Sequence, residues 1–451
     1  MNGNSVDSGR LDRRTFLRGS ALAAAATAAG GVAAPCFASG VVSTAKAAET
    51  LIASAPVLQN AAETSIGVSF AVRADASGWV DYATRADFSD VKRAYSGGHG
   101  LMNVSDRVCL VRLTGLKPAT HYHYRIGADR ISYRNGYAMR NLGSEVDPSV
   151  HSFTTLGASI AAPSFCVIND THDQKHVLGL VFSKIAAIRP SVVVWNGDAS
   201  NTSEDFETAA GIFLHPHPNH LSYAADTPYI FINGNHDFRG RFNRHLETLM
   251  MYRESAERAS EYAELGRNFV QRIGDIALIG LDTGEDKLDT NPVFAGIFRM
   301  KPYRELQAKW LAEVVQSPAV RTAKFKVALC HIPLFDADPT ANPGDVAPAD
   351  ADPKYTHNYA RWQRTCAGLW GPSLAKAGVQ LVVTGHQHRF RYDAPTGNRP
   401  WAQIVGGGPH FDKSRKAQFP TVVEGRVVDG KLQVTVHDVL HGTVAGEYAF
   451  A

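Results

Sequence analysis

The sequence has few cysteines, no marked excess of charge and no long hydrophobic run. Its 451 residues include only 5 cysteines, and no two of them form a C-x-x-C pair, which argues against a disulfide framework and a thiolate metal site. The formal net charge of +3 supplies no basic face for nucleic acid. The cysteines beyond position 36 are predicted to be buried free thiols, because most lie in or beside apolar stretches. They are Cys109, Cys166, Cys330 and Cys366.

The small positive charge arises in the first 47 residues, where five basic side chains stand against two acidic ones. Arg13 and Arg14 precede a stretch rich in alanine and glycine over residues 19–34. This arrangement resembles a bacterial twin-arginine signal peptide. The apolar stretch is short and weakly hydrophobic, which is unfavourable for a transmembrane helix. We expect residues 1–47 to be a signal peptide read by the twin-arginine export machinery, and the mature chain to be periplasmic or secreted without a membrane anchor. A disordered basic tail is the alternative.

Residues 50–156 have the pattern of an all-β domain. Apolar side chains alternate with small ones over residues 66–72, as in a half-buried strand, and turn residues separate several such runs. Short strands at this spacing favour a β-sandwich. The stretches LKPATHYHYRIG and FTT resemble a fibronectin type III-like domain. The same alternation places His121 and His123 on the solvent face, which does not favour a metal site there.

A different pattern occupies residues 160–451. The length of 451 residues exceeds what one hydrophobic core supports, so a second domain is expected here. Apolar runs alternate with helical segments such as 178–188, which predicts an α/β sheet. In such sheets ligands bind at the carboxyl ends of the strands, and five of the runs end in polar residues. These runs are 165–168, 192–195, 229–232, 325–330 and 381–383.

The five polar strand ends carry carboxylate, imidazole and amide side chains next to glycines. Each motif alone is weak, and the first could be an ordinary polar loop, but the ordered combination is not expected by chance. These donors suit first-row divalent metals, and a carboxylate can bridge two ions. In chain order the motifs are Asp170-x-His172, Gly197-Asp198, Gly234-Asn235-His236-Asp237, His331 and Gly385-His386-x-His388.

The combination resembles the calcineurin-like metallophosphoesterase family over residues 163–410. The resemblance implies an αββα four-layer sandwich and, with the preceding β-sandwich, the layout of a bacterial purple-acid-phosphatase-like protein. It implies a hydrolase in which a hydroxide bridging two metal ions, most readily Fe, Mn or Zn, attacks a small phosphate monoester, and the predicted signal peptide adds that this hydrolase is exported. A phosphodiesterase or nucleotidase with the same centre is the first alternative. A metal-binding surface protein without catalytic activity is the second.

The resemblance also assigns a role to each motif residue. Asp198 would bridge the two ions. His236 would stabilise or protonate the leaving group, and Asp237 would orient and charge His236. The remaining side chains are implied to bind a single ion, namely Asp170, His172 and His388 for one ion and Asn235, His331 and His386 for the other.

Two positions depart from the purple acid phosphatases. Those enzymes have a glycine where this chain has His172, and a tyrosine where this chain has Asn201, three residues after Asp198. The tyrosinate that gives them an iron charge-transfer band has no counterpart at this position. The resemblance therefore predicts a D-x-H type of metallophosphoesterase without a purple ferric centre.

Other polar residues near the motifs have more than one interpretation. Asp173 and His176 fit a turn and the start of a helix. The histidine-rich segment 215–220 either lines the cleft or forms a surface loop. The long insertion 337–362 is either a lid that contacts phosphate or an ordinary loop. No role is predicted for Asp282.

Overall fold

The computed structural model describes most of the chain after the predicted signal peptide. That peptide, the segment 215–220 and most of the insertion 337–362 lie outside the described residues. Within the described part, no helix is long and apolar enough to span a membrane. The described residues are 50–214, 222–252, 259–335, 359–410 and 417–451.

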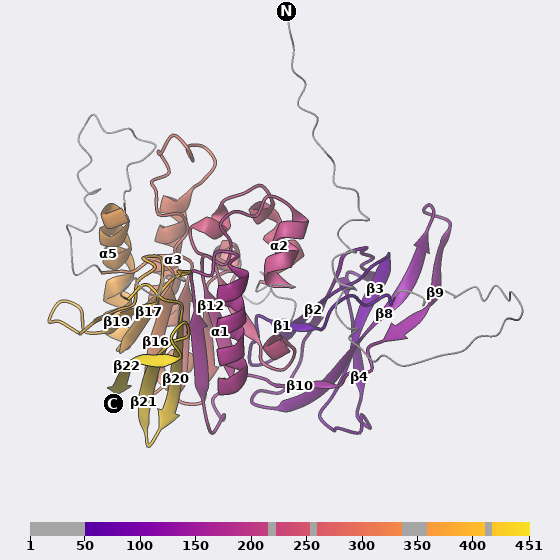
Figure 1. Ribbon diagram of the computed structural model, residues 1–451, viewed down its shortest axis with the longest axis horizontal. Coiled ribbons are helices and arrows are strands. Elements are labelled where there is room, and N and C mark those ends of the chain that lie inside the picture. Colours follow the sequence, from indigo (N-terminus) through magenta and orange to yellow (C-terminus); the bar gives the residue numbers. More distant parts are fainter. Residues whose placement is uncertain (1–49, 215–221, 253–258, 336–358, 411–416) are drawn as a thin grey trace, which may run out of the picture. The chain divides into compact units, whose positions relative to one another are not determined.

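Two antiparallel sheets form the N-terminal part, as the strand periodicity predicts (Figure 1). One contains β1, β2 and β7, and the other has the order β10-β8-β3-β4 with β9 paired to β8. Along β8, Tyr122 and Tyr124 are buried whereas His121 is exposed and His123 is partly exposed, as predicted. A minor hairpin joins β5 and β6. The bounds are β1 (Val57–Gln59), β2 (Ile66–Ala71), β3 (Ala76–Ala83), β4 (Lys92–Tyr95), β5 (Gly97–Gly98), β6 (Leu101–Met102), β7 (Val108–Leu113), β8 (His121–Tyr133), β9 (Met139–Val146) and β10 (His151–Thr154).

Two further sets of strands form the α/β part. The first has the order β22-β21-β20-β11-β12-β13, and the second has the order β14-β15-β16-β17-β19-β18. In each set the central strands run parallel, so their carboxyl ends share one edge of the sheet. The bounds are β11 (Ser164–Ile168), β12 (Val192–Asn196), β13 (Tyr229–Ile232), β14 (Phe269–Ile273), β15 (Ile276–Leu281), β16 (Phe325–Cys330), β17 (Leu381–Thr384), β18 (Arg391–Asp393), β19 (Ala402–Val405), β20 (Thr421–Val428), β21 (Lys431–Asp438) and β22 (Thr443–Phe450).

Helices connect these strands. The first helix, α1, ends where Arg189 adopts a left-handed φ of 54° next to Pro190, the predicted stop. The bounds are α1 (Lys175–Ile188), α2 (Phe206–Phe213), α3 (Met300–Val314), α4 (Pro318–Arg321) and α5 (Tyr359–Ala377), with 3-10 helices η2 (Ser222–Ala225), η3 (His236–Phe238), η4 (Phe242–Thr248) and η6 (Ser260–Leu265).

In the described residues, three hydrophobic cores separate the four predicted layers. Side chains of β12 alternate between two of these cores: Val192 and Val194 face the second sheet, whereas Val193 and Trp195 pack with α1 and α2. The third core lies between the second sheet and helices α3 and α5 (Figure 1). Continuous apolar strands are expected in a sheet that is covered on both faces. The predicted buried free thiols are confirmed for Cys109, Cys166, Cys330 and Cys366.

One sheet crosses the predicted domain boundary. Strand β1 pairs in parallel with β13 through Gln59 and Tyr229, which extends the first α/β sheet by β1, β2 and β7. The Gln59 amide also donates to the Tyr229 hydroxyl over 3.2 Å. Residues Thr50–Ala451 accordingly form one compact unit. The β-rich part is therefore continuous with the sheet that carries the first three motifs.

Candidate metal centre

The five strand ends converge, and they bring the residues singled out by the sequence to one place. Neighbouring strands β11, β12 and β13 are parallel, as are β16 and β17 in the facing sheet. Their carboxyl ends therefore open on the same edge. The residues are Asp170 and His172 after β11, Asp198 after β12, Asn235, His236 and Asp237 after β13, His331 after β16, and His386 and His388 after β17.

Asp170, His172, Asp198 and His388 form the first group of potential ligands, and one ligand atom from each lies within 4.8 Å of the others. The Nε2 atoms of His172 and His388 are 2.9 Å apart. His388 Nε2 is 3.3 Å from Asp170 Oδ1, and His172 Nε2 is 3.6 Å from Asp198 Oδ2. Two ring nitrogens and two carboxylate oxygens thus point into one small volume.

Asp198, His331 and His386 form the second group, again with ligand atoms within 4.8 Å of one another. His331 Nε2 lies 3.1 Å from Asp198 Oδ2. The amide oxygen of Asn235 lies 2.9 Å from His386 Nδ1, which places this amide beside the group. Asp198 belongs to both groups, the position that a bridging ligand requires.

Hydrogen bonds orient two of the histidine rings toward these groups. His331 Nδ1 donates to the Asn196 carbonyl over 2.8 Å, and His172 Nδ1 donates to the Asn201 side-chain oxygen over 2.9 Å. Each bond leaves the Nε2 lone pair facing the centre, as is usual for metal-binding histidines. Within the described part of the chain, Asp170 Oδ1 and His331 Nε2 are buried and make no well-aligned hydrogen bond, although both lie close to other ligand atoms of the centre. Because buried polar atoms are rarely left unpaired, these atoms fit a metal ion.

The carboxylates and imidazoles of the centre shift one another's pKa. Burial would raise the pKa of Asp170, but His331 and His388 hold it well below its usual value. Burial would lower the pKa of His331, but Asp198 and Asp170 outweigh it and raise the pKa to about 10. A proton and a metal ion compete for the same His331 lone pair, so metal binding here releases protons.

The backbone is left-handed at five of the predicted ligands, a conformation that residues other than glycine seldom adopt. Each such residue costs about 1–3 kcal/mol and persists only where the surrounding structure requires it, often at functional sites. The residues are Asp170 (φ 50°), His172 (φ 46°), Asp198 (φ 50°), His386 (φ 71°) and His388 (φ 53°).

Two glycines let the strand ends approach each other. A Cβ atom on Gly234 would lie 2.2 Å from Asp198 Oδ1. Gly197 has a φ of 85°, and a Cβ atom there would lie 2.5 Å from His331 Nδ1. Both distances are far inside van der Waals contact. Glycine is therefore needed at these motif positions, as the sequence suggests.

Gly234→Ala is expected to lower metal affinity about 10- to 100-fold, because the new methyl group displaces the Asp198 carboxylate. Forcing an extra carbon into this packed site should also destabilise the protein by about 1–3 kcal/mol. Metal content after dialysis and the thermal unfolding midpoint measure the two effects. Gly211→Ala in α2 is the matched control, since a Cβ there meets no atom of the described residues within 4 Å. Full metal content in Gly234→Ala would show that the close approach is not required.

His236 lies beside Asp198 without pointing a ring nitrogen at either ligand group. Its backbone N–H donates to Asp198 Oδ1 over 2.9 Å, and its Nδ1 lies 3.0 Å from the Asn201 carbonyl. Its Nε2 lies 3.1 Å from Arg239 Nη1. Because a guanidinium can only donate, Nε2 accepts and Nδ1 carries the proton. Burial and the charge of Arg239 keep the pKa of His236 below its usual value despite the nearby Asp198.

The expected orientation of His236 by Asp237 is corrected by the structure. The Asp237 carboxylate accepts hydrogen bonds from the backbone N–H of Ser200, the Ser200 hydroxyl and the backbone N–H of Gly234. The two residues are consecutive in the 3-10 turn η3, and Asp237 is turned into the fold, where it is buried. Burial and the nearby Asp198 raise the pKa of Asp237 to about 7. Asn201 and Arg239, rather than Asp237, hold the His236 ring.

Sequence reasoning missed an ion cluster next to His236. Arg239 Nε and Nη2 donate to the two carboxylate oxygens of Glu285 over 3.0 and 2.8 Å. Arg239 Nη2 also lies 3.4 Å from Asp286 Oδ1. Glu285 and Asp286 are two adjacent acids in the loop that follows the buried strand β15, which ends at Leu281, so an acidic pair near a strand end was visible in the sequence. The sequence drew attention to Asn201 only because purple acid phosphatases have a tyrosine at this position, and it did not indicate that Asn201 binds His172 and His236.

Two other acidic residues have structural roles. Asp282 accepts hydrogen bonds from the Tyr303 hydroxyl and the Gly284 backbone N–H, which fixes the turn after β15. Asp173 accepts from the backbone N–H of Asn201 and stands in the turn before α1, as expected.

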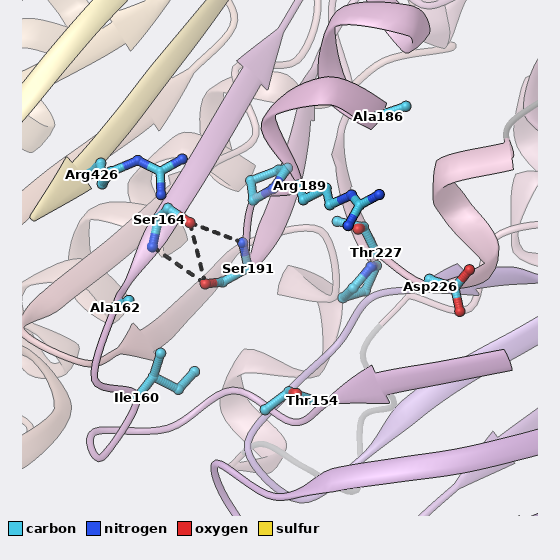
Figure 2. A pocket seen from close by; sticks show the side chains of 12 residues that line it. Thr154, Ile160, Ala162, Ser164, Ala186, Arg189, Ser191, Asp226, Thr227 and Arg426 are labelled. Carbon is cyan, nitrogen blue, oxygen red and sulfur yellow. Dashed lines mark hydrogen bonds between the residues drawn. The ribbon is translucent and has the colours of Figure 1, made fainter.

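A separate cavity of about 680 Å³ lies at the opposite ends of β11 and β12 (Figure 2). Ser164 and Ser191 border it, and the side chain of each bonds to the backbone N–H of the other. Arg189, Asp226 and Arg426 are the charged residues of its wall. The cavity lies at the amino ends of these strands, whereas the motifs lie at their carboxyl ends. The cavity is therefore separate from the metal centre.

Two facing sheets covered by helices, with nitrogen and oxygen ligands gathered at the strand ends, define a metal-dependent phosphoester hydrolase. The sequence model of the calcineurin-like phosphoesterase family matches residues 163–390, half of the chain. The protein belongs to this family, whose chemistry and the two ligand groups indicate divalent metal ions as cofactors.

Solved structures show the same fold. Purple acid phosphatase PPD1 from yellow lupin (Lupinus luteus) seeds superposes with a TM-score of 0.59 at 12% identity, over 88% of this chain and 74% of that chain. PhoD superposes with a TM-score of 0.55, also at 12% identity, over 87% of this chain and 88% of that chain. Among curated proteins, no sequence matches significantly.

Proposed function

We propose that the protein is an exported phosphatase that hydrolyses phosphate monoesters with two metal ions. The observation that carries this proposal is the membership of Asp198 in both ligand groups. A single carboxylate between two sets of ligands holds two ions close together, the arrangement used for in-line displacement at phosphorus. Monoesters are proposed as substrates because the motifs and the domain layout resemble those of purple acid phosphatases, whose fold this chain shares.

The ligand assignment follows the two groups. Asp198 lies between them, and Asn235 completes the second. Imidazole, carboxylate and amide donors favour Fe, Mn or Zn over Mg alone. When bound, the ions supply a nucleophile at neutral pH and neutralise phosphate charge. The single-ion ligands are Asp170, His172 and His388 for one ion and Asn235, His331 and His386 for the other.

The remaining residues orient the ligands and the substrate. Asn201 fixes His172 with Nε2 directed at the centre. His236, whose backbone N–H binds Asp198, presents its ring beside the centre on the side assigned to the leaving group. Its ring plane is nearly perpendicular to that of His172, with ring centroids 4.8 Å apart.

Export is proposed from the sequence of the N-terminal segment. Arg13 and Arg14 followed by an apolar, small-residue stretch favour the twin-arginine route, which carries folded proteins. Folding before export lets the metal centre be loaded inside the cell. A phosphodiesterase or nucleotidase with the same centre is the alternative function, and a metal-binding surface protein without turnover is the remaining one.

Metal analysis combined with a panel of chromogenic esters tests the function. The purified protein is expected to contain metal, to hydrolyse a nitrophenyl phosphate monoester faster than the corresponding diester, and to lose activity on chelation. Adding back Fe, Mn or Zn separately should restore activity and identify the preferred ion, because the ions act directly on phosphate. Metal-loaded protein that cleaves no ester would exclude the proposed activity. A faster diester reaction would favour the phosphodiesterase.

A further inference from the structure

Arg239 is a largely buried cation at the edge of the metal centre, and its carboxylate partners hold it in place. Its side chain is only 21% exposed, and its Glu285 and Asp286 partners are 1% and 6% exposed. Lys287 also contacts both carboxylates, at 3.3 Å from Glu285 and 2.6 Å from Asp286. A buried charge is costly unless it is paired, and the two carboxylates supply the opposite charge that allows the guanidinium to be buried here.

Among the residues that the structure describes, the hydrogen bonds of Arg239 leave one of its donors unused. A guanidinium has five N–H groups. Arg239 makes four hydrogen bonds, two to Glu285, one to Asp286 and one from Nη1 to His236. The carboxylates occupy the Nε and Nη2 side, so the second N–H of Nη1 remains on the side of His236. Because the carboxylates fix the guanidinium plane, the direction of this N–H is fixed as well.

The position of His236 connects this donor to the ligand groups. The His236 backbone binds Asp198, and its ring packs against the ring of His172. Asp286, which is bonded to Arg239, also lies near the second ligand group, with Oδ2 at 3.9 Å from His386 Nε2. Arg239 and its acidic partners thus border both ligand groups. An anion bound at the centre on the His236 side would meet the unused N–H of Arg239.

We propose that Arg239 binds a non-bridging phosphoryl oxygen of the substrate and thereby favours phosphate monoesters over diesters. This inference rests on the proposed function and adds a specificity-determining residue to it. A monoester presents more charge on its free phosphoryl oxygens than a diester, which replaces one of them with an ester group. A charge-assisted hydrogen bond from a fixed guanidinium is strongest to the more charged oxygen.

Three variants and one control test the proposal. Arg239→Gln removes the charge, and Arg239→Lys keeps a charge without the planar fork. The double variant Arg239→Gln/Glu285→Gln also removes the carboxylate that the first change leaves unpaired. Arg241→Gln is the control, because it deletes the same charge from an exposed residue two positions along the chain. Circular dichroism and metal content are measured for every variant.

The ratio of kcat/KM for a nitrophenyl monoester to that for the bis-nitrophenyl diester is the main readout. Loss of one charge-assisted hydrogen bond should lower monoester kcat/KM about 10- to 100-fold in Arg239→Gln and in the double variant, mainly through KM, with a much smaller loss for the diester. Arg239→Lys should fall in between, and Arg241→Gln should match the wild type.

Other outcomes overturn the proposal. An equal loss for both esters, or loss of bound metal, would mean that Arg239 only supports the fold, and unchanged kinetics would mean that it does not contact substrate. If Arg239→Gln does not fold, the same monoester-to-diester ratio is measured on the folded double variant, and that ratio decides.

If the wild type cleaves no ester, the proposed function fails. Calorimetry with inorganic phosphate on the metal-loaded protein then tests Arg239 separately, with about tenfold weaker binding expected in Arg239→Gln.

Discussion

Asp198→Ala is expected to release both metal ions and to reduce turnover at least about 1,000-fold, since the ions supply both nucleophile activation and charge neutralisation. The reason is that one carboxylate serves both ligand groups. Its Oδ2 lies 3.1 Å from His331 Nε2 and 3.6 Å from His172 Nε2, so its removal opens both sites at once. Metal content by mass spectrometry and kcat on a phosphate monoester measure the effect.

The matched control for Asp198→Ala is Asp275→Ala, which deletes an exposed carboxylate in the turn between β14 and β15. It should retain metal and full activity. A variant of Asp198 that keeps one equivalent of metal would show that the residue binds a single ion. A variant that keeps both would contradict the assignment of Asp198 as the shared ligand.

His236→Ala is expected to keep its metal and to lose turnover by about 100- to 10,000-fold. Its ring nitrogens contact Asn201 and Arg239 rather than the ligand groups, so metal binding does not depend on the ring. Its backbone N–H, which binds Asp198, is retained in alanine. Metal content together with single-turnover kinetics separates the two effects.

His245→Ala, which removes an exposed ring in η4, controls for the loss of an imidazole and should behave as the wild type. An emptied centre in His236→Ala would place His236 among the residues that hold metal. Full turnover would remove it from the reaction and leave Arg239 as the group on that side of the centre.

The elements that the sequence identified depend on local patterns. Apolar runs that end in polar residues located β11, β12, β13, β16 and β17, and alternation in β8 placed His121 and His123 toward solvent. The glycines at 197 and 234 marked close approaches that a Cβ atom would obstruct. Strand periodicity and turn chemistry act over a few residues, so they can be recognised without the fold.

The partners of His236 depend on contacts that local patterns do not contain. Asp237 is its neighbour in sequence, yet the 3-10 turn directs Asp237 toward Ser200 and Gly234. Arg239 meets Glu285 across 46 residues of chain. The two adjacent acids after β15 indicated a polar site in the sequence, but no local pattern identified Arg239 as their partner.

By itself, the sequence determined the family resemblance, the strand ends and the set of nitrogen and oxygen donors. The resemblance also implied a shared role for Asp198. Only the tertiary structure decided that Asn201 and Arg239 hold His172 and His236, and that β1 extends the first sheet. The physical reason is that these relations join residues far apart in the chain. They depend on strand register and on left-handed turns at the strand ends, and residue periodicity specifies neither.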